Sequence, residues 1–254
     1  IGPDSDFFAA GGNSIAAILL NEQILQKFDS KVPLKHFFEQ SSPAAVLAYL
    51  ERNAGGRKQE AMPVAVGERV PLSSHQRAIW LEMQRQGDSK AYHFKALVRF
   101  KGELDVAALE SSLSTLYASH EVYRASVEVD GGKPYQRLRE PWQVRLDVVD
   151  LRHLERGEAE AQCVALLDGP LNDQFNIACA PLARMCLVRI SEDHHALLVV
   201  EHHLIHDGWS FNLFLDQLFE GYEICRAALP WAPAAGRPYG EYSLAQQKWL
   251  DSEA

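Results

Sequence analysis

Apolar positions follow two different periodicities along the chain. Between residues 14 and 28 they recur at helical spacing, at Ile15, Ile18, Leu19 and Leu25. A short turn is expected around Phe37 and Phe38, after which Ser42 and Pro43 supply an N-cap and a first-turn proline for a last helix through residue 50. The first fifty residues are therefore predicted to form a small all-helical bundle.

After residue 70, strand-like alternation and helical spacing follow one another. Alternation predicts strands over residues 94–100, 123–129, 134–138, 182–190 and 195–202. Helical spacing predicts helices that begin after Asp105, over residues 154–167, and at Ser210, with Asp105 and Ser210 as N-caps. Gly131 and Gly132 are expected to turn the chain between two of the strands. This order of elements predicts a mixed α/β domain.

The segment between the two patterns has neither periodicity. Residues 54–70 contain glycines, charges and a proline, which is typical of a linker. The predicted organisation is a first domain over residues 1–53, a linker over 54–70 and a second domain over 71–254. Three short helices enclose little core, and fifty residues is close to the smallest stable domain size, so we expect a further helix upstream of Ile1.

Charge and hydropathy narrow the classes of function. The 254 residues carry a formal charge of −9, from 34 acids against 25 lysines and arginines, which argues against binding nucleic acid through its phosphates. The longest apolar run, near residues 196–200, is far shorter than a membrane span, and the first residues do not resemble an export signal. The sequence therefore predicts a soluble, cytoplasmic protein with no membrane partner.

The four cysteines lack the close pairs that a zinc site or a redox motif needs. They are Cys163, Cys179, Cys186 and Cys225. We expect all four to be small buried hydrophobic residues.

The first segment with candidate chemistry is DFFAAGGNSI, residues 6–15. Gly11 and Gly12 permit a tight turn, and Ser14 then opens a helix with its hydroxyl outside the helical core. Amide groups at a helix start favour a phosphodiester, although a serine here also fits a simple N-cap.

This segment resembles the peptidyl carrier domains of nonribosomal peptide synthetases, whose signature joins an acidic residue, a Phe-Phe pair and Gly-Gly-x-Ser. The resemblance covers residues 1–53 and implies that Ser14 carries 4'-phosphopantetheine, attached by a phosphopantetheinyl transferase. Asn13 stands where the family more often has His or Asp, which leaves the partner preference open. The family's first helix is absent, so the resemblance implies a truncated carrier bundle.

A second candidate site is the run HHLIHDGWS, residues 202–210, where a predicted strand ends and a helix begins. Neighbouring side chains in a strand point to opposite faces, so His202 and His203 cannot both face one substrate, and one of them is expected to be structural. A zinc pair of His202 and His206 would need a helix at that spacing, so no metal is expected. Histidines satisfied within the core are the other alternative.

This run resembles the His-His-x-x-x-Asp-Gly motif of condensation domains, which belong to the chloramphenicol acetyltransferase-like superfamily. Other positions that match the family's motifs are Ser73, Gln76, Ile79, Trp80, His120, Glu121, Arg124, residues 175–177, Pro181, Leu182 and Arg184, with a weaker match at Tyr239, Glu241, Tyr242 and Gln246. The resemblance implies that residues 71–254 form the N-terminal α/β lobe of such a domain and that a C-terminal lobe is a partner.

The same resemblance implies roles for the site residues. His203 would be the imidazole nearest the attacking amine, as a base or a positioning group. Asp207 would form an ion pair with Arg124 that braces the loop, Gly208 would allow a close turn, and His202 would be the structural neighbour.

The implied function is amide formation between two carrier-bound thioesters. Upstream and downstream carrier and adenylation domains are then partners, and the fragment alone is expected to be inactive. Alternatives are a non-catalytic carrier-docking scaffold, an ester-forming variant, and an epimerisation domain, in which the tryptophan usually follows the serine. Heterocyclisation would replace the histidine doublet, and a free acyltransferase using coenzyme A would not need the fused carrier.

Overall fold

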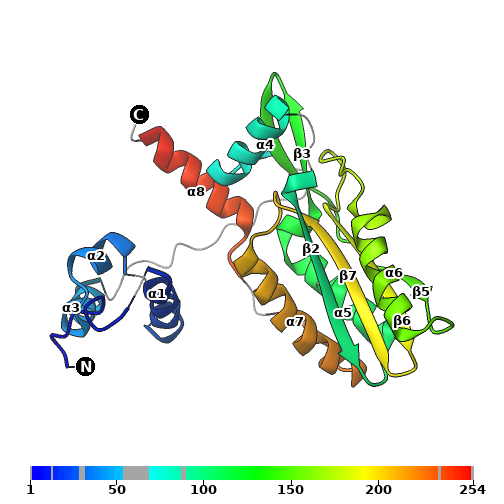
Figure 1. Ribbon diagram of the computed structural model, residues 1–254. Coiled ribbons are helices and arrows are strands. Elements are labelled where there is room, and N and C mark those ends of the chain that lie inside the picture. The colour runs from blue at the N-terminus through cyan, green and yellow to red at the C-terminus, as the bar shows by residue number, and fades with distance from the viewer. Residues whose placement is uncertain are drawn as a thin grey trace. The chain divides into compact units, whose positions relative to one another are not determined.

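The computed structural model describes residues 2–12, 14–28, 32–53, 69–86, 90–233 and 236–252. The chain divides into two compact units, Ile1–Glu60 and Ala61–Ala254, each with its own core (Figure 1). In the residues that the structure describes, no helix combines the length and the apolar character that a membrane span requires.

The first unit contains three helices, α1 (Ser14–Phe28), α2 (Leu34–Glu39) and α3 (Pro43–Asn53). Its small core consists of Ala17, Ile24, Val32, Phe37 and Leu50. The Ser42 hydroxyl accepts a hydrogen bond from the Ala45 amide at 3.3 Å, which confirms the predicted start of α3. The turn expected at Phe37 is a helix of six residues, because Phe37 packs fully buried between the other two helices.

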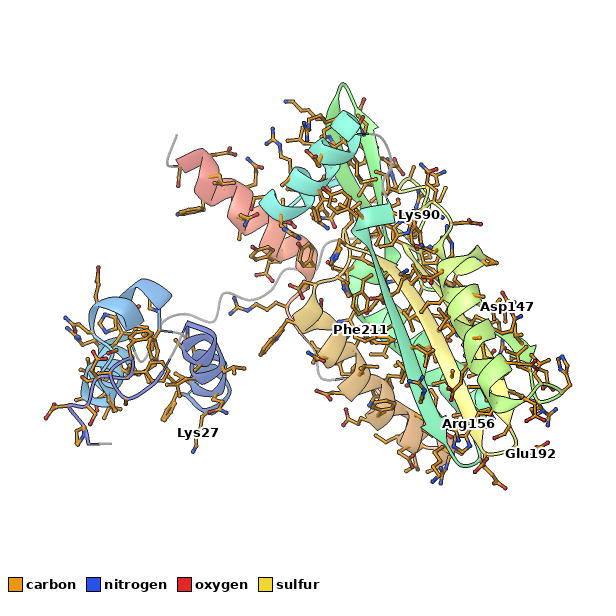
Figure 2. The ribbon with its side chains drawn as sticks, viewed as in Figure 1. Lys27, Lys90, Asp147, Arg156, Glu192 and Phe211 are labelled. Carbon is orange, nitrogen blue, oxygen red and sulfur yellow. The ribbon has the colours of Figure 1, made fainter. Side chains whose placement is uncertain are left out.

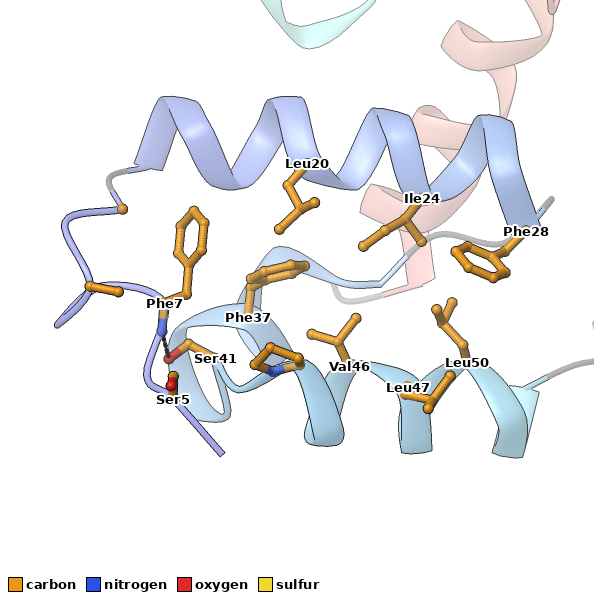
Figure 3. A pocket seen from close by; sticks show the side chains of 13 residues that line it. Ser5, Phe7, Leu20, Ile24, Phe28, Phe37, Ser41, Val46, Leu47 and Leu50 are labelled. Atoms are coloured by element: carbon orange, nitrogen blue, oxygen red, sulfur yellow. Dashed lines mark hydrogen bonds between the residues drawn. The ribbon is translucent and has the colours of Figure 1, made fainter. Parts of the chain in front are cut away.

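An apolar groove of about 370 Å³ runs along this small core (Figure 3). Phe7, Leu20, Ile24 and Phe37 line it on one side, and residues of α3 line the other. Three short helices cannot close around their apolar side chains, as the marginal size of the segment predicts.

The second unit contains two sheets. The four-stranded sheet has the order β2-β7-β6-β5, and the three-stranded sheet has the order β1-β4-β3. The strands are β1 (Arg69–Pro71), β2 (His93–Lys101), β3 (Ala125–Asp130), β4 (Lys133–Leu138), β5 (Asp147–Asp150), β6 (Ala183–Ser191) and β7 (His194–His202). All neighbours are antiparallel except β5 and β6. Gly131 and Gly132 have positive φ, as the predicted turn between β3 and β4 requires.

Helices cover both faces of the larger sheet. The helices described in the second unit are α4 (Ser74–Gln86), α5 (Val106–Ser119), α6 (Arg156–Asp168), α7 (Gly208–Arg226) and α8 (Tyr239–Ser252), with 3-10 turns at Lys90–Tyr92, Glu121–Arg124 and Pro170–Asn172. Helices α5 and α7 pack on one face and α6 on the other (Figure 1). Strand β7 is buried on both faces, which explains the apolar run at residues 196–200.

Two further sequence predictions need correction. Helix α7 begins at Gly208 with Asp207 as its N-cap, so Ser210 is not the capping residue. Cys163 and Cys186 are buried as expected, but Cys225 is half-buried and Cys179 is exposed, because Cys179 lies in the irregular segment before β6. The predicted cap at Asp105 is confirmed, since its side chain accepts from the Ala108 amide at 3.0 Å.

Candidate active site

A cavity of about 520 Å³ opens where β7 ends and α7 begins. Its wall includes His203 and His206 from the connecting loop, residues 203–207, and the start of α7. It also includes the 3-10 turn at residues 121–124 and the first residues of α4 and α8. Polar and charged side chains in the wall include His75, His120, Arg124, His203, Asp207 and Tyr239. The candidate residues are thus brought together from segments far apart in the sequence.

The two histidines of the doublet lie in different environments. His202 is fully buried beside His93 and Phe175, and its Nδ1 accepts a hydrogen bond from the Leu204 amide at 3.1 Å. Burial, assisted by the neighbouring His93 and His203, lowers the pKa of His202 to about 4. His203 is half-buried on the cavity wall. His202 is therefore a neutral core residue at neutral pH, and His203 is the histidine of the doublet that a substrate can reach.

Backbone contacts fix the orientation of His203. Its amide donates to the Tyr92 carbonyl at 2.8 Å, which extends the β2–β7 ladder by one residue. Its Nδ1 lies 3.4 Å from the His206 carbonyl oxygen. A carbonyl can only accept, so this long hydrogen bond favours the tautomer with the proton on Nδ1 and the lone pair on Nε2.

The loop behind His203 is held by a buried glutamine. Gln76 in α4 donates from Nε2 to the Leu204 carbonyl at 2.8 Å and to the Gln136 side chain at 3.0 Å. Its own oxygen accepts from the Ser73 amide at 3.0 Å. Gln76 thus joins the start of α4, strand β4 and the histidine loop in one network, a role that the motif match alone did not define.

Asp207 stabilises the start of α7. Its Oδ1 accepts from the Ser210 amide at 2.8 Å and from the Ser210 hydroxyl at 2.7 Å, while the Asp207 amide donates to that hydroxyl, also at 2.8 Å. Burial alone would raise the pKa of Asp207, but these bonds outweigh it and lower the pKa. Together they form a reciprocal capping box at the cavity edge.

The expected ion pair between Asp207 and Arg124 is not formed. The Asp207 carboxylate is exposed and bound to Ser210, whose donors lie only three residues away and need little ordering. Arg124 instead donates from Nη1 to the Arg139 carbonyl at 2.6 Å, and its buried Nε has no hydrogen-bond partner. Arg124 and Asp207 therefore share the cavity wall without neutralising each other.

The expectation for Gly208 is also wrong. Gly208 is the first residue of α7, its φ is not positive, and a Cβ there would meet no atom within 4 Å. The chain turns over residues 203–205 instead, within the loop that follows β7. No conformational requirement for glycine exists at this position.

One buried pair at the site escaped the sequence analysis. Glu201 is fully buried in β7, and its Oε2 lies 2.9 Å from Nδ1 of His206. The sequence signal for this pair was Glu201 itself, a carboxylate at the end of an otherwise apolar strand. Across the described part of the chain, no group of three or more histidine, cysteine or acidic residues is arranged to hold a metal ion. His206, which was considered as a zinc ligand, instead contacts Glu201 through Nδ1.

The carrier unit places Ser14 at the first position of α1. The preceding Gly11 has a φ of 96°, and a Cβ on Gly12 would lie 2.4 Å from the Phe7 ring, so both glycines are required by the turn. Asn13 lies outside the described residues. The first-turn amides of a fifteen-residue helix lack intrahelical partners, so this backbone fits the phosphodiester of 4'-phosphopantetheine.

Family comparisons agree with this division of the chain. Residues 66–254 match the model of the condensation domain, and residues 1–50 match the model of the phosphopantetheine attachment site, which carries 4'-phosphopantetheine on a serine. The chain therefore belongs to the condensation-domain family, with a phosphopantetheine attachment domain ahead of it.

The similar curated proteins are large peptide synthetases. The chain is 29% identical over its whole length to gramicidin S synthase 2 of Aneurinibacillus migulanus, of which it spans 5%. It is 34% identical over 86% of its length to surfactin synthase subunit 2 of Bacillus subtilis, of which it spans 6%. The chain is thus a small part of the length of these relatives.

Solved structures of related domains share the fold. The X-domain in a complex with OxyB from teicoplanin biosynthesis has a TM-score of 0.66 at 29% identity, over 78% of this chain and 42% of that one. The first condensation domain of the CDA synthetase has a TM-score of 0.60 at 26% identity, over 66% of this chain and 43% of that one. The mixed α/β fold expected from the sequence is confirmed.

Proposed function

We propose that this chain contributes one carrier and one lobe of the active site to peptide synthesis, in which an amine attacks a carrier-bound acyl thioester and an amide forms. One observation carries the proposal. The ring of His203 stands on the wall of a large cavity while its neighbour His202 is buried, so the strand end presents one accessible imidazole. The fused phosphopantetheine attachment domain supports the same substrate class.

When bound at Ser14, 4'-phosphopantetheine supplies a thiol that holds the acyl group as a thioester. The chain's own task is proton transfer and placement. The attacking amine must lose a proton as its nitrogen bonds to the carbonyl carbon, and the departing sulfur must end as a thiol. His203 Nε2 can accept that proton or hydrogen-bond the nitrogen, because Nδ1 is turned toward the His206 carbonyl.

The surroundings of His203 hold it in place for this step. Thioesters are already activated, so placement and exclusion of water account for much of the acceleration. The Tyr92 carbonyl and the Gln76 network fix the backbone on either side of the ring. The Asp207 cap fixes the start of α7 at the cavity edge, and neither Asp207 nor Arg124 is assigned contact with substrate.

The proposed partners follow from the same chemistry. A second condensation lobe would complete the cavity, since solved relatives extend over more than twice the matched length. Upstream and downstream carrier domains would present the two thioesters, adenylation domains would load them, and a phosphopantetheinyl transferase would modify Ser14.

A second candidate function is a non-catalytic docking scaffold. It is favoured by the similarity to the X-domain, whose solved complex contains OxyB. On this hypothesis the cavity would be a remnant, and the lobe would present a surface to a separate enzyme. An epimerisation function is less favoured, because Trp209 precedes Ser210 in this chain.

The test is product formation by the condensation domain extended through its second lobe, with donor and acceptor carriers loaded. Wild type is expected to yield amide, and His203→Ala is expected to yield little. Arg189→Gln, which changes a residue of β6 outside the cavity wall, serves as the control and is expected to match wild type. No amide from either protein would favour the scaffold, and equal amide yields from both would contradict the role assigned to His203.

A further inference from the structure

The pair formed by Glu201 and His206, here called the acid–imidazole pair, lies directly behind the proposed catalytic imidazole. Glu201 is 0% exposed and His206 is 6% exposed. Their Oε2 and Nδ1 atoms are 2.9 Å apart, whereas Glu201 Oε1 and His206 Nε2 have no hydrogen-bond partner. One direct hydrogen bond thus joins two buried ionisable groups.

The walls around this pair are aromatic. Phe94 of β2 is the cross-strand neighbour of Glu201, and its ring lies 4.2 Å from the His206 ring, centroid to centroid. Phe211, which points from α7 toward β2 (Figure 2), lies 4.7 Å from Phe94 and 6.0 Å from His206. The His206 ring is therefore enclosed on two sides by apolar surface.

The ionisable neighbours come from every element packed on the pair. Tyr117 of α5 and Tyr123 of the 3-10 turn face Glu201: burial raises the pKa of both phenols, and the charge of the carboxylate raises it further. Asp207 follows His206 in the chain, and His203 lies on the cavity side. Among the described residues no lysine or arginine forms an ion pair with Glu201, whose polar contacts come from His206 and Tyr123.

The pair is linked to His203 through the backbone. The His206 carbonyl is the group that faces His203 Nδ1, at 3.4 Å, and the two imidazole rings lie 5.3 Å apart. The carbonyl can hold that position only if residue 206 is fixed. The bond from Nδ1 to Glu201, together with packing on Phe94, fixes it.

We propose that Glu201 and His206 are positioning residues that set the tautomer and orientation of His203 during acyl transfer. The inference deepens the proposed function and rests on it. Glu201 acts through His206, the His206 carbonyl acts on Nδ1 of His203, and the lone pair of Nε2 is thereby kept toward the cavity. Neither residue of the pair touches substrate, and no step transfers a proton through them.

The positioning role of Glu201 and His206 can be separated from their contribution to the free energy of folding. A buried carboxylate–imidazole pair is costly to desolvate, and apolar residues of similar size in place of a whole buried pair are often neutral or stabilising. The double variant Glu201→Leu/His206→Leu leaves an apolar pair against Phe94 and Phe211. It is therefore expected to fold, with a melting temperature at or above that of wild type, while the anchor of the His206 carbonyl is lost.

The experiment measures amide formation by these variants in the extended domain with loaded carriers. In the double variant kcat is expected to fall about ten-fold or more, with KM for the loaded carriers within roughly two-fold of wild type, because placement of the base and not binding is disturbed. Glu201→Gln keeps an oxygen acceptor for His206 Nδ1 and is expected to retain most of the rate. His195→Leu changes a buried histidine at the opposite end of β7 and is the matched control.

Imidazole ¹⁵N spectra of the same proteins give an independent readout. Wild type and Glu201→Gln are expected to show His203 with the proton on Nδ1, and the double variant is expected to show both tautomers. A double variant with the wild-type kcat and a single His203 tautomer would overturn the proposal. If it does not fold, Glu201→Met/His206→Met, which also replaces the whole pair by apolar side chains, decides between the same two outcomes.

The failure of this inference is distinguishable from failure of the proposed function. If His203→Ala is inactive while the double variant keeps the full rate, the proposed function stands and the positioning role is wrong. If His203→Ala itself keeps the full rate, the proposed role of His203 in amide formation is wrong. The tautomer spectra of His203 then still show whether the acid–imidazole pair orients its ring. A loss in Glu201→Gln as large as in the double variant would contradict the hydrogen-bonded anchor.

Discussion

The two units of this chain place their key residues in contrasting ways. In the carrier unit Ser14 begins a helix, and the local requirement is a turn through Gly11 and Gly12. In the condensation unit His203 follows a strand buried on both faces and is held by groups from the 3-10 turn before β2, from α4 and from its own loop. An attachment site needs access for an enzyme, whereas a proton acceptor needs a fixed ring.

The two units also differ in how completely their cores are packed. Among the described side chains the carrier core is small and borders an open apolar groove, whereas the larger unit packs helices on both faces of its larger sheet. Replacement of Ser14 is expected to alter chemistry alone, whereas a side chain at Gly12 would collide with Phe7. In the histidine doublet, replacement of His203 is expected to affect chemistry, and replacement of His202 is expected to affect stability.

The largest expected effect is at the attachment serine. Incubation with coenzyme A and a phosphopantetheinyl transferase is expected to add one phosphopantetheine to wild type, and Ser14→Ala is expected to abolish the addition because the nucleophile is gone. Intact-mass measurement checks both. Ser42→Ala removes a helix N-cap elsewhere in the same unit and is the control, which should still be modified. A mass increase in Ser14→Ala would refute the assignment.

The next largest effect is the pH dependence of stability that comes from the buried His202. Because its pKa in the folded chain is about 4, His202 stays neutral there, while in the unfolded chain it binds a proton below about pH 6.5. Stability from this residue is therefore complete above pH 6.5 and is lost as the pH falls toward 4, by about 1.4 kcal/mol per pH unit at most and about 3 kcal/mol in all.

Denaturant unfolding of wild type and His202→Phe between pH 7 and pH 4 measures this slope. The difference between the two free energies of unfolding is expected to change by about 3 kcal/mol in favour of the variant as the pH falls. His153→Gln, at an exposed histidine, is the control and should preserve the wild-type slope. Parallel curves for wild type and His202→Phe would show that His202 is not held neutral by burial.

The smallest expected effect concerns the helix cap. Asp207→Ala removes the acceptor of two hydrogen bonds from Ser210 and is expected to lower the free energy of unfolding by about 1 kcal/mol. A double-mutant cycle with Arg124→Ala should give a coupling below about 0.5 kcal/mol, since the two side chains do not pair. A coupling of several kcal/mol would restore the ion pair that the family resemblance implies.

Local patterns were sufficient to predict most of the fold. Strands β2, β3, β4, β6 and β7 and helices α1, α3, α5, α6 and α7 were all expected near their observed positions, because their apolar positions follow strand or helix spacing or, in β7, form a short continuous run. Helices α4 and α8 were missed, since both segments are polar on average. Strands β1 and β5 were missed because three or four residues give too short a pattern.

The site was predictable where it depends on local sequence. Strand alternation predicted different environments for His202 and His203, and His203 reaches the cavity from the loop after β7, a strand that is buried on both faces. The partners of Asp207, Arg124 and Glu201 did not follow, because they depend on three-dimensional distances that spacing does not encode. Asp207 accepts hydrogen bonds from the nearby Ser210, and Glu201 contacts His206 across the turn at residues 203–205.

The most direct measurement is the single-turnover rate of amide formation by His203→Ala, taken with its free energy of unfolding on the same preparation of the extended domain. We expect a rate lower by about 10²- to 10⁴-fold, as for loss of a proton acceptor. Stability should stay within about 1 kcal/mol of wild type, since the residue is half-buried on a cavity wall. A stable His203→Ala protein that forms amide at the wild-type rate would contradict the role assigned to this imidazole.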